Sequence, residues 1–254
     1  MSGTFAPRPG AAPLASQVRA QALIEARLTM RNGEQLLLAL VIPVLLLVGA
    51  VLGADRLGVD FSRPAVDELT PGVLALAILS SSFTSLAIMT GFERRYGVLK
   101  RLGSSPLPRH GLLLGKVGAL LLVEALQLAV LGGVAATLGW APANGWFAAV
   151  LLTFAGTFAF ASLALLMAGA LRAEATLAAA NLVYVLLVAG GGVIAPSSSY
   201  GAAGGVLQWL PSAALGDGMR AAFLDGRTPW LDLAVLLAWG AVGTVLTART
   251  FSWE

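Results

Sequence analysis

The sequence predicts an all-α polytopic membrane protein with six transmembrane helices, an N-terminal interfacial helix, and a re-entrant outer element between the fifth and sixth spans. Composition is the first reason: 57% of the 254 residues are hydrophobic and 11% are charged, against about 25% charged residues in a soluble domain. The second is that apolar runs long enough to cross a bilayer recur along the chain. The third is that basic residues gather on alternate connections between these runs.

Composition also excludes several classes of site. The chain has no cysteine, which excludes disulfides, thiolate metal sites and cysteine nucleophiles. His110 is the single histidine, so a two-histidine metal motif is absent. The only Gly-Lys pair, Gly115-Lys116, is followed by Val117 rather than Ser or Thr, so the chain lacks the phosphate-binding loop that ATP hydrolysis needs. We predict no catalytic residue, no metal, no cofactor and no nucleic-acid partner for this polypeptide.

Residues 1–35 form the part that precedes the spans. The tail 1–13 is rich in proline and is expected to be disordered. A helix is predicted over 14–31, with a stripe of small and apolar residues on one face and arginines at its margins. Such a helix can lie in the membrane interface with its arginines reaching headgroups; an ordinary solvated helix is the alternative.

Residues 36–254 form the membrane domain. Spans are expected at about 36–54, 71–92, 112–138, 146–171, 175–195 and 230–248. Pro43 should kink the first span, and the serines and threonines of the second should face other helices. In the outer segment 196–229, Tyr200 to Leu210 is apolar but too short to span, and Pro211 is expected to close it. A helix dipping into the outer leaflet or packing on top of the bundle is predicted there, with a long loop as the alternative.

The basic residues give the orientation. Twelve of the sixteen lie on the amino segment, the 92–116 region, the 172–174 turn and the carboxyl tail. The other connections carry four basic residues: Arg56, Arg63, Arg220 and Arg227. Both termini are therefore predicted to be cytoplasmic. Four tryptophans are then expected at the outer interface: Trp140, Trp146, Trp209 and Trp230.

The loop 92–111, between the second and third spans, is the most informative stretch. Val98, Leu99 and Leu102 fall at i, i+1 and i+4, which predicts a short helix that Gly103 ends. Apolar side chains flanked by Lys100 and Arg101 suit docking onto another protein. The simpler interpretation is that cytoplasmic loops of any membrane protein collect basic residues.

Glu93-Arg94, Gly97, Leu99, Leu102 and Pro106-Leu107 resemble the cytoplasmic loop of type-2 ATP-binding-cassette (ABC) exporter permeases, with the daunorubicin-resistance type of drug exporter as the nearest comparison. The resemblance implies that this loop carries a coupling helix held in a groove of a separate ATPase subunit, which binds ATP and Mg. It also implies a second permease copy, identical or related, and residence in the bacterial cytoplasmic membrane. The lipid-buried spans suggest a hydrophobic, amphipathic or lipid-like substrate. The residues expected to couple to the ATPase are Glu93, Arg94, Gly97, Val98, Leu99, Lys100, Arg101, Leu102 and Pro106.

These coupling residues have separate expected roles. Val98, Leu99 and Leu102 would be the buried anchors in the ATPase groove. Arg94, Lys100 and Arg101 would steer and orient it, and Glu93 would fix the bend where the second span meets the loop.

Glu124 is the one ionisable residue well inside a predicted span, so it should face the bundle interior. Lys116, two turns earlier on roughly the same face, could approach it. Two interpretations stay open: a polar element of the translocation route or a proton relay, and an interhelical hydrogen bond with Ser, Thr or Asn181. The polar residues predicted for the pathway are Glu124, Gln127, Asn181 and Tyr184.

Two other functions remain open on the sequence. A proton-driven secondary transporter has Glu124 as its lone support, and the inverted repeats expected of it are not visible. A membrane-embedded enzyme or scaffold is the other, and no catalytic cluster supports the enzyme version.

Overall fold

The computed structural model describes residues 12–58, 61–102 and 108–250, and throughout these ranges the regular elements are all helical. The predicted fold class, an all-α multi-pass membrane protein, is confirmed. The helices within residues 12–102 are α1 (Leu14–Arg31), α2 (Gly33–Leu57), α3 (Ala65–Leu79), η1 (Ser80–Ser85), α4 (Leu86–Arg95) and α5 (Val98–Leu102). The rest are α6 (Arg109–Thr137), α7 (Trp146–Ala170), α8 (Ala173–Gly190), η2 (Ser197–Ala203), α9 (Gly204–Leu207), α10 (Pro211–Asp225) and α11 (Trp230–Thr250).

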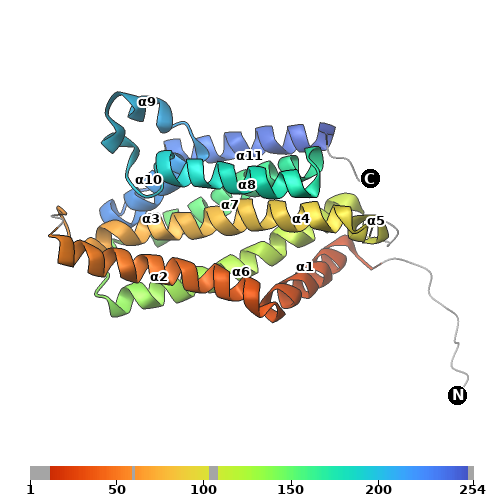
Figure 1. Ribbon diagram of the computed structural model, residues 1–254, viewed down its shortest axis with the longest axis horizontal. Coiled ribbons are helices and arrows are strands. Elements are labelled where there is room, and N and C mark those ends of the chain that lie inside the picture. The colour runs from red at the N-terminus through yellow and green to blue at the C-terminus, as the bar shows by residue number, and fades with distance from the viewer. Residues whose placement is uncertain (1–11, 59–60, 103–107, 251–254) are drawn as a thin grey trace, which may run out of the picture.

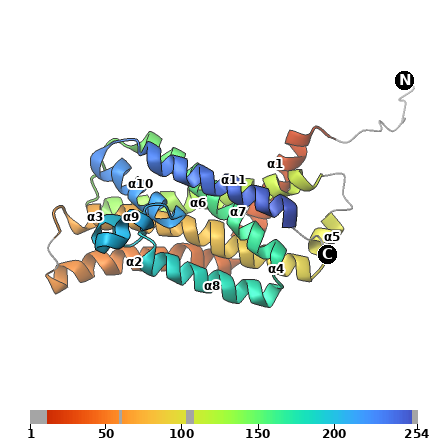
Figure 2. The ribbon, with the colours of Figure 1, turned by 90° about the horizontal axis from the view of Figure 1, so that it is seen from above.

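Within the described ranges, five segments are long and apolar enough to cross a membrane: Ala65–Arg95, Gly111–Thr137, Trp146–Ala170, Ala173–Gly190 and Trp230–Thr250. The first expected span corresponds to α2, which carries the shorter apolar stretch Ala39–Ala54 and contains Pro43. Figures 1 and 2 both place α5, the start of α1 and the end of α11 at one end of the bundle, and η2 and α9 at the other.

The centre of the bundle is α7, which packs against α11, α10 and α4. Its contact with α11 is close, because a Cβ added at Gly240 or Gly243 would overlap Phe158 or Ser162 of α7. Small residues that let backbones approach are the usual means of packing helices in lipid, where burial of apolar surface between helices offers little gain.

The second span is interrupted by a π-helical stretch, η1, which lies between α3 and α4 and was not predicted. Ser81 and Ser82 donate hydrogen bonds to Ala77 O (2.8 Å) and Ile78 O (2.5 Å) within the same span. Such side-chain bonds compete with the regular backbone pattern and bend helices. Ser81, Ser82 and Thr90 are buried, which agrees with the expectation that hydroxyls of this span face other helices.

The outer segment differs from the prediction. Pro211 does not close a helix; it begins α10, whose first position tolerates a proline because that N–H needs no partner. The stretch 200–210 is divided among η2, α9 and a turn, with non-helical backbone at Tyr200 and Gly201. α10, which was not predicted, is buried against α3, α7 and α11.

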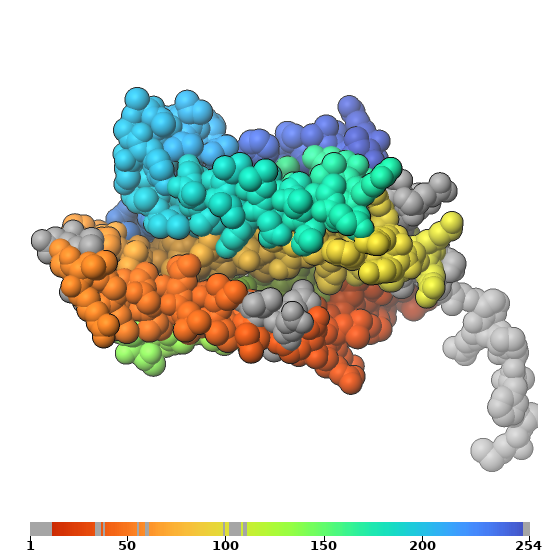
Figure 3. All heavy atoms as spheres, viewed as in Figure 1, coloured from red at the N-terminus to blue at the C-terminus, as the bar shows by residue number. Residues whose placement is uncertain are grey.

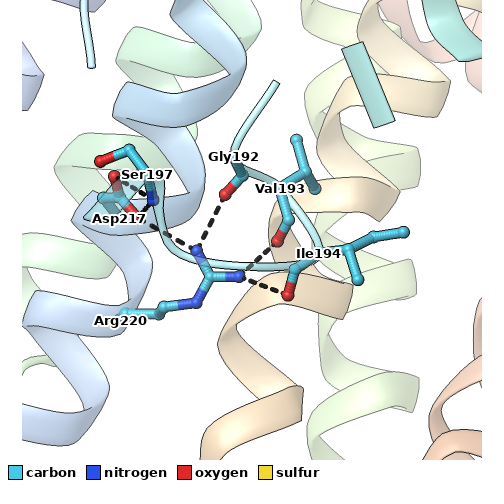
Figure 4. A network of polar contacts seen from close by, with 6 residues as sticks. All are labelled: Gly192, Val193, Ile194, Ser197, Asp217 and Arg220. Atoms are coloured by element: carbon cyan, nitrogen blue, oxygen red, sulfur yellow. Dashed lines mark hydrogen bonds and ion pairs between the residues drawn. The ribbon is translucent and has the colours of Figure 1, made fainter. Parts of the chain in front are cut away.

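A buried arginine holds this outer segment in place (Figure 4). Arg220 of α10 is 7% exposed and donates to the carbonyls of Gly192 (2.9 Å), Val193 (2.5 Å) and Ile194 (2.8 Å). Asp217 accepts from Arg220 and from the backbone N–H of Ser197, each at 3.2 Å. The three carbonyls follow α8, which ends at Gly190, five residues before the predicted end of the fifth span. Arg220 thus supplies hydrogen-bond donors to carbonyls of the irregular segment that follows α8.

Three of the four tryptophans expected at the outer interface are exposed: Trp146 (54%), Trp209 (55%) and Trp230 (70%). Trp140 differs from these three in being buried: it is 8% exposed and packs edge-on against Phe223 and Trp146.

Candidate functional site

The candidate coupling segment begins where the second span ends. α4 stops at Arg95, and Gly97 takes a left-handed backbone conformation (φ 67°) that glycine adopts without steric cost. α5 then runs from Val98 to Leu102, as predicted. Val98, Lys100 and Arg101 are exposed. Gly103 and Pro106 lie outside the described residues, as do the side chains of Leu99 and Leu102.

Glu93 fastens the end of α4 to two other helices. Lys116 of α6 lies 2.6 Å from Glu93 Oε2 and 3.3 Å from a carboxylate oxygen of Glu25 on α1. The lysine side chain is 1% exposed, so both ion pairs are shielded from solvent. Burial raises the pKa of Glu25, and Lys116 and Gln21 oppose this effect. The expectation that Lys116 approaches Glu124 is therefore wrong: its ammonium group serves the carboxylates near the loop instead.

The packing around Lys116 leaves little room between α1 and α6. A Cβ added at Gly115 would lie 2.6 Å from Gln21 Cγ, and one at Gly118 would lie 3.1 Å from Ala22 Cβ. The inner face of α1 is thus buried against α6 at Ala22 and Ala26. Its outer face exposes Ile24, Leu28 and the flanking arginines.

Arg94 and Arg95 connect the same segment to α7 and α8. Arg94 donates to Gly169 O (2.5 Å) and Leu171 O (2.8 Å) at the carboxyl end of α7. The last carbonyls of a helix lack intrahelical partners and carry partial negative charge, so a guanidinium is favourable there. Arg95 forms an ion pair with Glu174 of α8; this pair is half exposed and contributes little stability. Glu93, Arg94 and Arg95, at the end of α4 just before α5, thus contact α1, α6, α7 and α8.

Glu124 lies in the middle of the bundle and is fully buried. Thr157 of α7 donates to one carboxylate oxygen (2.5 Å). The hydroxyl of Ser81 in η1 lies 3.2 Å from the other, and its single proton is shared between this oxygen and Ala77 O. The carboxyl group therefore joins α6 to α7 and to the π-helical stretch. The interhelical hydrogen bond that was one of its two interpretations is present, with Ser81 and Thr157 rather than Asn181 as partners.

The other predicted pathway residues are not gathered at one point. Gln127 is buried and donates to Ala39 O of α2 (2.6 Å). Tyr184 is half-buried and hydrogen-bonds Ser80. Asn181 is exposed on α8 and donates to Leu177 O of its own helix (2.9 Å).

Two features of the site were missed from the sequence. Glu25 was not singled out from the sequence, because no local signal indicated a partner 91 residues away. Arg220 was counted as an outer-side residue, whereas its guanidinium is buried. An arginine that directly follows Gly218 and Met219 in an apolar stretch could have signalled burial, because a charge there needs partners.

These observations define a class of protein: a multi-pass helical membrane protein whose short basic helix α5 is anchored to the bundle by the residues at the end of α4. The described residues contain no cluster of three or more metal-ligating side chains.

The chain belongs to a family of ATP-binding-cassette permeases, because the family model described as "ABC-2 family transporter protein" matches residues 61–249. It is also similar to "Putative transport permease YvfS" of Bacillus subtilis (strain 168), with 23% identity over 229 residues, which cover 86% of this chain and 90% of that protein. The type-2 ABC permease family inferred from the loop is confirmed. The protein is thus a multi-pass membrane permease of an ABC transporter, and an ABC ATPase subunit is its implied partner.

Proposed function

We propose that this chain forms the translocation pathway of an exporter that moves a hydrophobic, amphipathic or lipid-like substrate, driven by ATP hydrolysis in a separate subunit. The observation that carries the proposal is the anchoring of α5. Glu93, Arg94 and Arg95 connect the start of α5 to four helices. A displacement of α5 would therefore be transmitted to much of the bundle. ATP and Mg would bind to the ATPase subunit, and this chain would supply no catalytic group.

The orientation follows from the same end of the molecule. α1, α5 and the end of α11 lie together (Figures 1 and 2), and the basic residues are concentrated on the connections at that end. With that end in the cytoplasm of a bacterial cell, the ATPase would meet α5, and both termini would be cytoplasmic.

A second permease copy, identical or related, would complete the pathway. Among the five segments long and apolar enough to cross a membrane, α8 is the least covered by the rest of the chain, followed by α6, and Figure 3 shows α8 uncovered on one face of the molecule. Asn181 lies on this helix among exposed apolar residues: Leu177, Leu182, Val185 and Leu186. A polar side chain in a lipid-facing position is unfavourable, so cover by another copy explains the face better than lipid does.

Docking of the ATPase is tested by replacing Leu99 and Leu102 with aspartate and measuring the ATPase subunit that co-purifies in mild detergent. We expect the double variant to lose most of it, because charged side chains cannot be buried in an apolar groove. Leu57→Asp is the matched control, since Leu57 is 81% exposed at the other end of the bundle. Full retention by the double variant would remove the coupling role of α5, and transport by the purified chain without nucleotide would remove the ATP-driven mechanism.

A further inference from the structure

The outer face of α1 combines basic and apolar side chains. Arg27 and Arg31 are both exposed and lie four residues apart, so they project from the same side of the helix. Ile24 (53% exposed) and Leu28 (63%) lie beside them. Together with Met30, these four residues line a shallow surface hollow of about 330 Å³.

The two arginines have no anionic partner among the residues that the structure describes. Glu25 is the single acidic residue of α1, and its carboxylate is held by Lys116 at the boundary with α6. No ion pair or hydrogen bond joins Arg27 or Arg31 to another described side chain. Like charges at this spacing repel each other, so an anion from outside the chain would stabilise this face.

The direction of the face is fixed by the packing of α1. Ala22 and Ala26 are buried against α6, and the ion pair between Glu25 and Lys116 lies at the same boundary. α1 could not turn its arginines toward the bundle without breaking these contacts. The basic face therefore stays available to whatever surrounds the protein.

α1 leads into α2 at the depth where lipid headgroups are expected. Only Asn32 separates the two helices, and Figures 1 and 2 show α1 running from the end of the bundle that carries α5 toward the start of α2. The apolar stretch of α2 starts at Ala39, eight residues after Arg31, which is at most about 12 Å along a helix. An arginine side chain this close to the hydrocarbon region can reach the phosphates of the headgroup layer.

We propose that Arg27 and Arg31 bind the phosphate group of an anionic membrane lipid, with Ile24 and Leu28 in contact with the apolar part of the same molecule. The unpaired positive charges select a lipid with a net negative headgroup over a zwitterionic one. The exposed apolar residues between them select a lipid over free phosphate, which offers them no apolar surface. The proposal goes beyond an interfacial position for α1, because it assigns one class of headgroup to two residues.

The test measures which lipid lies beside this face. Because the chain has no cysteine, Ile24→Cys provides a single position for a fluorescent label. The labelled full chain is reconstituted in phosphatidylcholine vesicles that contain a minor fraction of brominated phosphatidylglycerol or, in parallel, the same fraction of brominated phosphatidylcholine. Bromine quenches a fluorophore only at short range, so the two quenching curves give the relative affinity of the two lipids for the site.

A second label position controls for the membrane as a whole. Leu237 of α11 is 52% exposed, and no lysine or arginine lies within seven residues of it in the sequence. Leu237→Cys should therefore show no preference between the two lipids. Ile24→Cys should prefer phosphatidylglycerol by roughly five- to thirtyfold, the effect of one to two basic residues near an anionic surface.

Replacing both Arg27 and Arg31 with glutamine should bring the preference at Ile24→Cys close to one, while both lipids still quench the label. Arg19→Gln is the matched control and should keep most of the preference. Arg19 is also an exposed arginine of α1, but it lies about two turns farther from α2 than Arg27 does.

Equal quenching by the two lipids at Ile24→Cys, or a preference that survives the loss of both arginines, would overturn the proposal. Quenching by neither lipid would also overturn it, because water or another protein would then cover the face. Inorganic phosphate added at constant ionic strength separates the two sources of phosphate: it should leave the preference unchanged, and a preference that it abolishes would assign the arginines to free phosphate instead. The measurement needs neither nucleotide nor the ATPase, so its failure would leave the proposed export function standing.

Discussion

At the scale of single residues, a few buried polar side chains connect helices that apolar packing alone would leave free to slide. Lys116 holds the carboxylates of Glu25 and Glu93 from two helices. Glu124 does the same with two hydroxyl groups in mid-bundle, and Arg220 with three carbonyls at the outer end. Each lies where an unpaired polar group would be costly, so each fixes the relative position of the elements that supply its partners.

Lys116→Met should destabilise the protein strongly. It leaves two partly buried carboxylates facing each other without a cation, and breaking a buried ion pair in this way costs on the order of 3–5 kcal/mol. The measurement is the thermal unfolding midpoint in detergent. Lys100→Met is the control, because Lys100 is exposed and its loss should leave the midpoint unchanged.

A second variant separates charge from packing at this cluster. Adding Glu25→Gln to Lys116→Met removes one of the repelling charges and should recover part of the lost stability. Equal midpoints for the single and double variants would show that Lys116 contributes by filling space.

Glu124→Gln should transport like the wild type at every pH tested. The contacts of Glu124 are those of a hydrogen-bond acceptor, and glutamine keeps one acceptor oxygen of similar shape. Glu124→Ala should lose both bonds, each worth about 1 kcal/mol in a membrane interior, and should lower the unfolding midpoint. Transport assays across a pH series check the first statement; a pH-dependent loss in Glu124→Gln would instead establish a proton relay.

At the scale of elements, the turn between α4 and α5 sets the direction of the coupling helix. Arg94 fixes the end of α4 against α7, and Gly97 then reverses the sign of φ before α5 begins. A rigid α4 followed by one special backbone position gives α5 a defined angle, which a longer loop would not give.

Gly97→Ala should impair coupling more than folding. A non-glycine residue in the left-handed conformation costs roughly 1–2 kcal/mol, which the short and exposed α5 can relieve by changing direction. We expect the ATPase subunit still to co-purify while ATP hydrolysis no longer responds to substrate. Gly133→Ala is the control, because Gly133 is in a regular helix with open space around it. Normal coupling in Gly97→Ala would show that the angle of α5 is not set at this turn.

Helices that are determined by residues within or directly beside them could be predicted from the sequence. Residues 14–31 and 98–102 were placed correctly because their apolar spacing and terminating residues lie within the helix or beside it. α10 was missed because Pro211 both ends and begins helices, and only packing against α3, α7 and α11 decides between them. The partners of Lys116 and Glu124 could not be predicted, because they lie on other helices and the sequence does not show which helices pack together.

At the scale of the whole molecule, the uneven cover of the spans is the main indication of assembly. The second span is largely enclosed by the rest of the chain, whereas α8 is mostly uncovered. In lipid, exposed leucine and valine are ordinary, since lipid chains are as apolar as those residues. The exposed amide of Asn181 is unfavourable in lipid, and for this reason we expect the contact with a second copy to lie on α8.

The absence of cysteine from the chain makes this contact directly testable. In an isologous interface, residues near the two-fold axis meet their own copies, and a disulfide forms when the two Cα atoms are about 4.4–6.8 Å apart. Leu182→Cys and Leu186→Cys, introduced singly, should give oxidant-dependent covalent dimers in membranes from at least one of the two positions. Leu122→Cys on α6, at a similarly exposed apolar residue (47%), should remain monomeric. Dimers from Leu122→Cys with none from the α8 positions would place the contact on the opposite side of the bundle, and the exposure of Asn181 would then need another explanation.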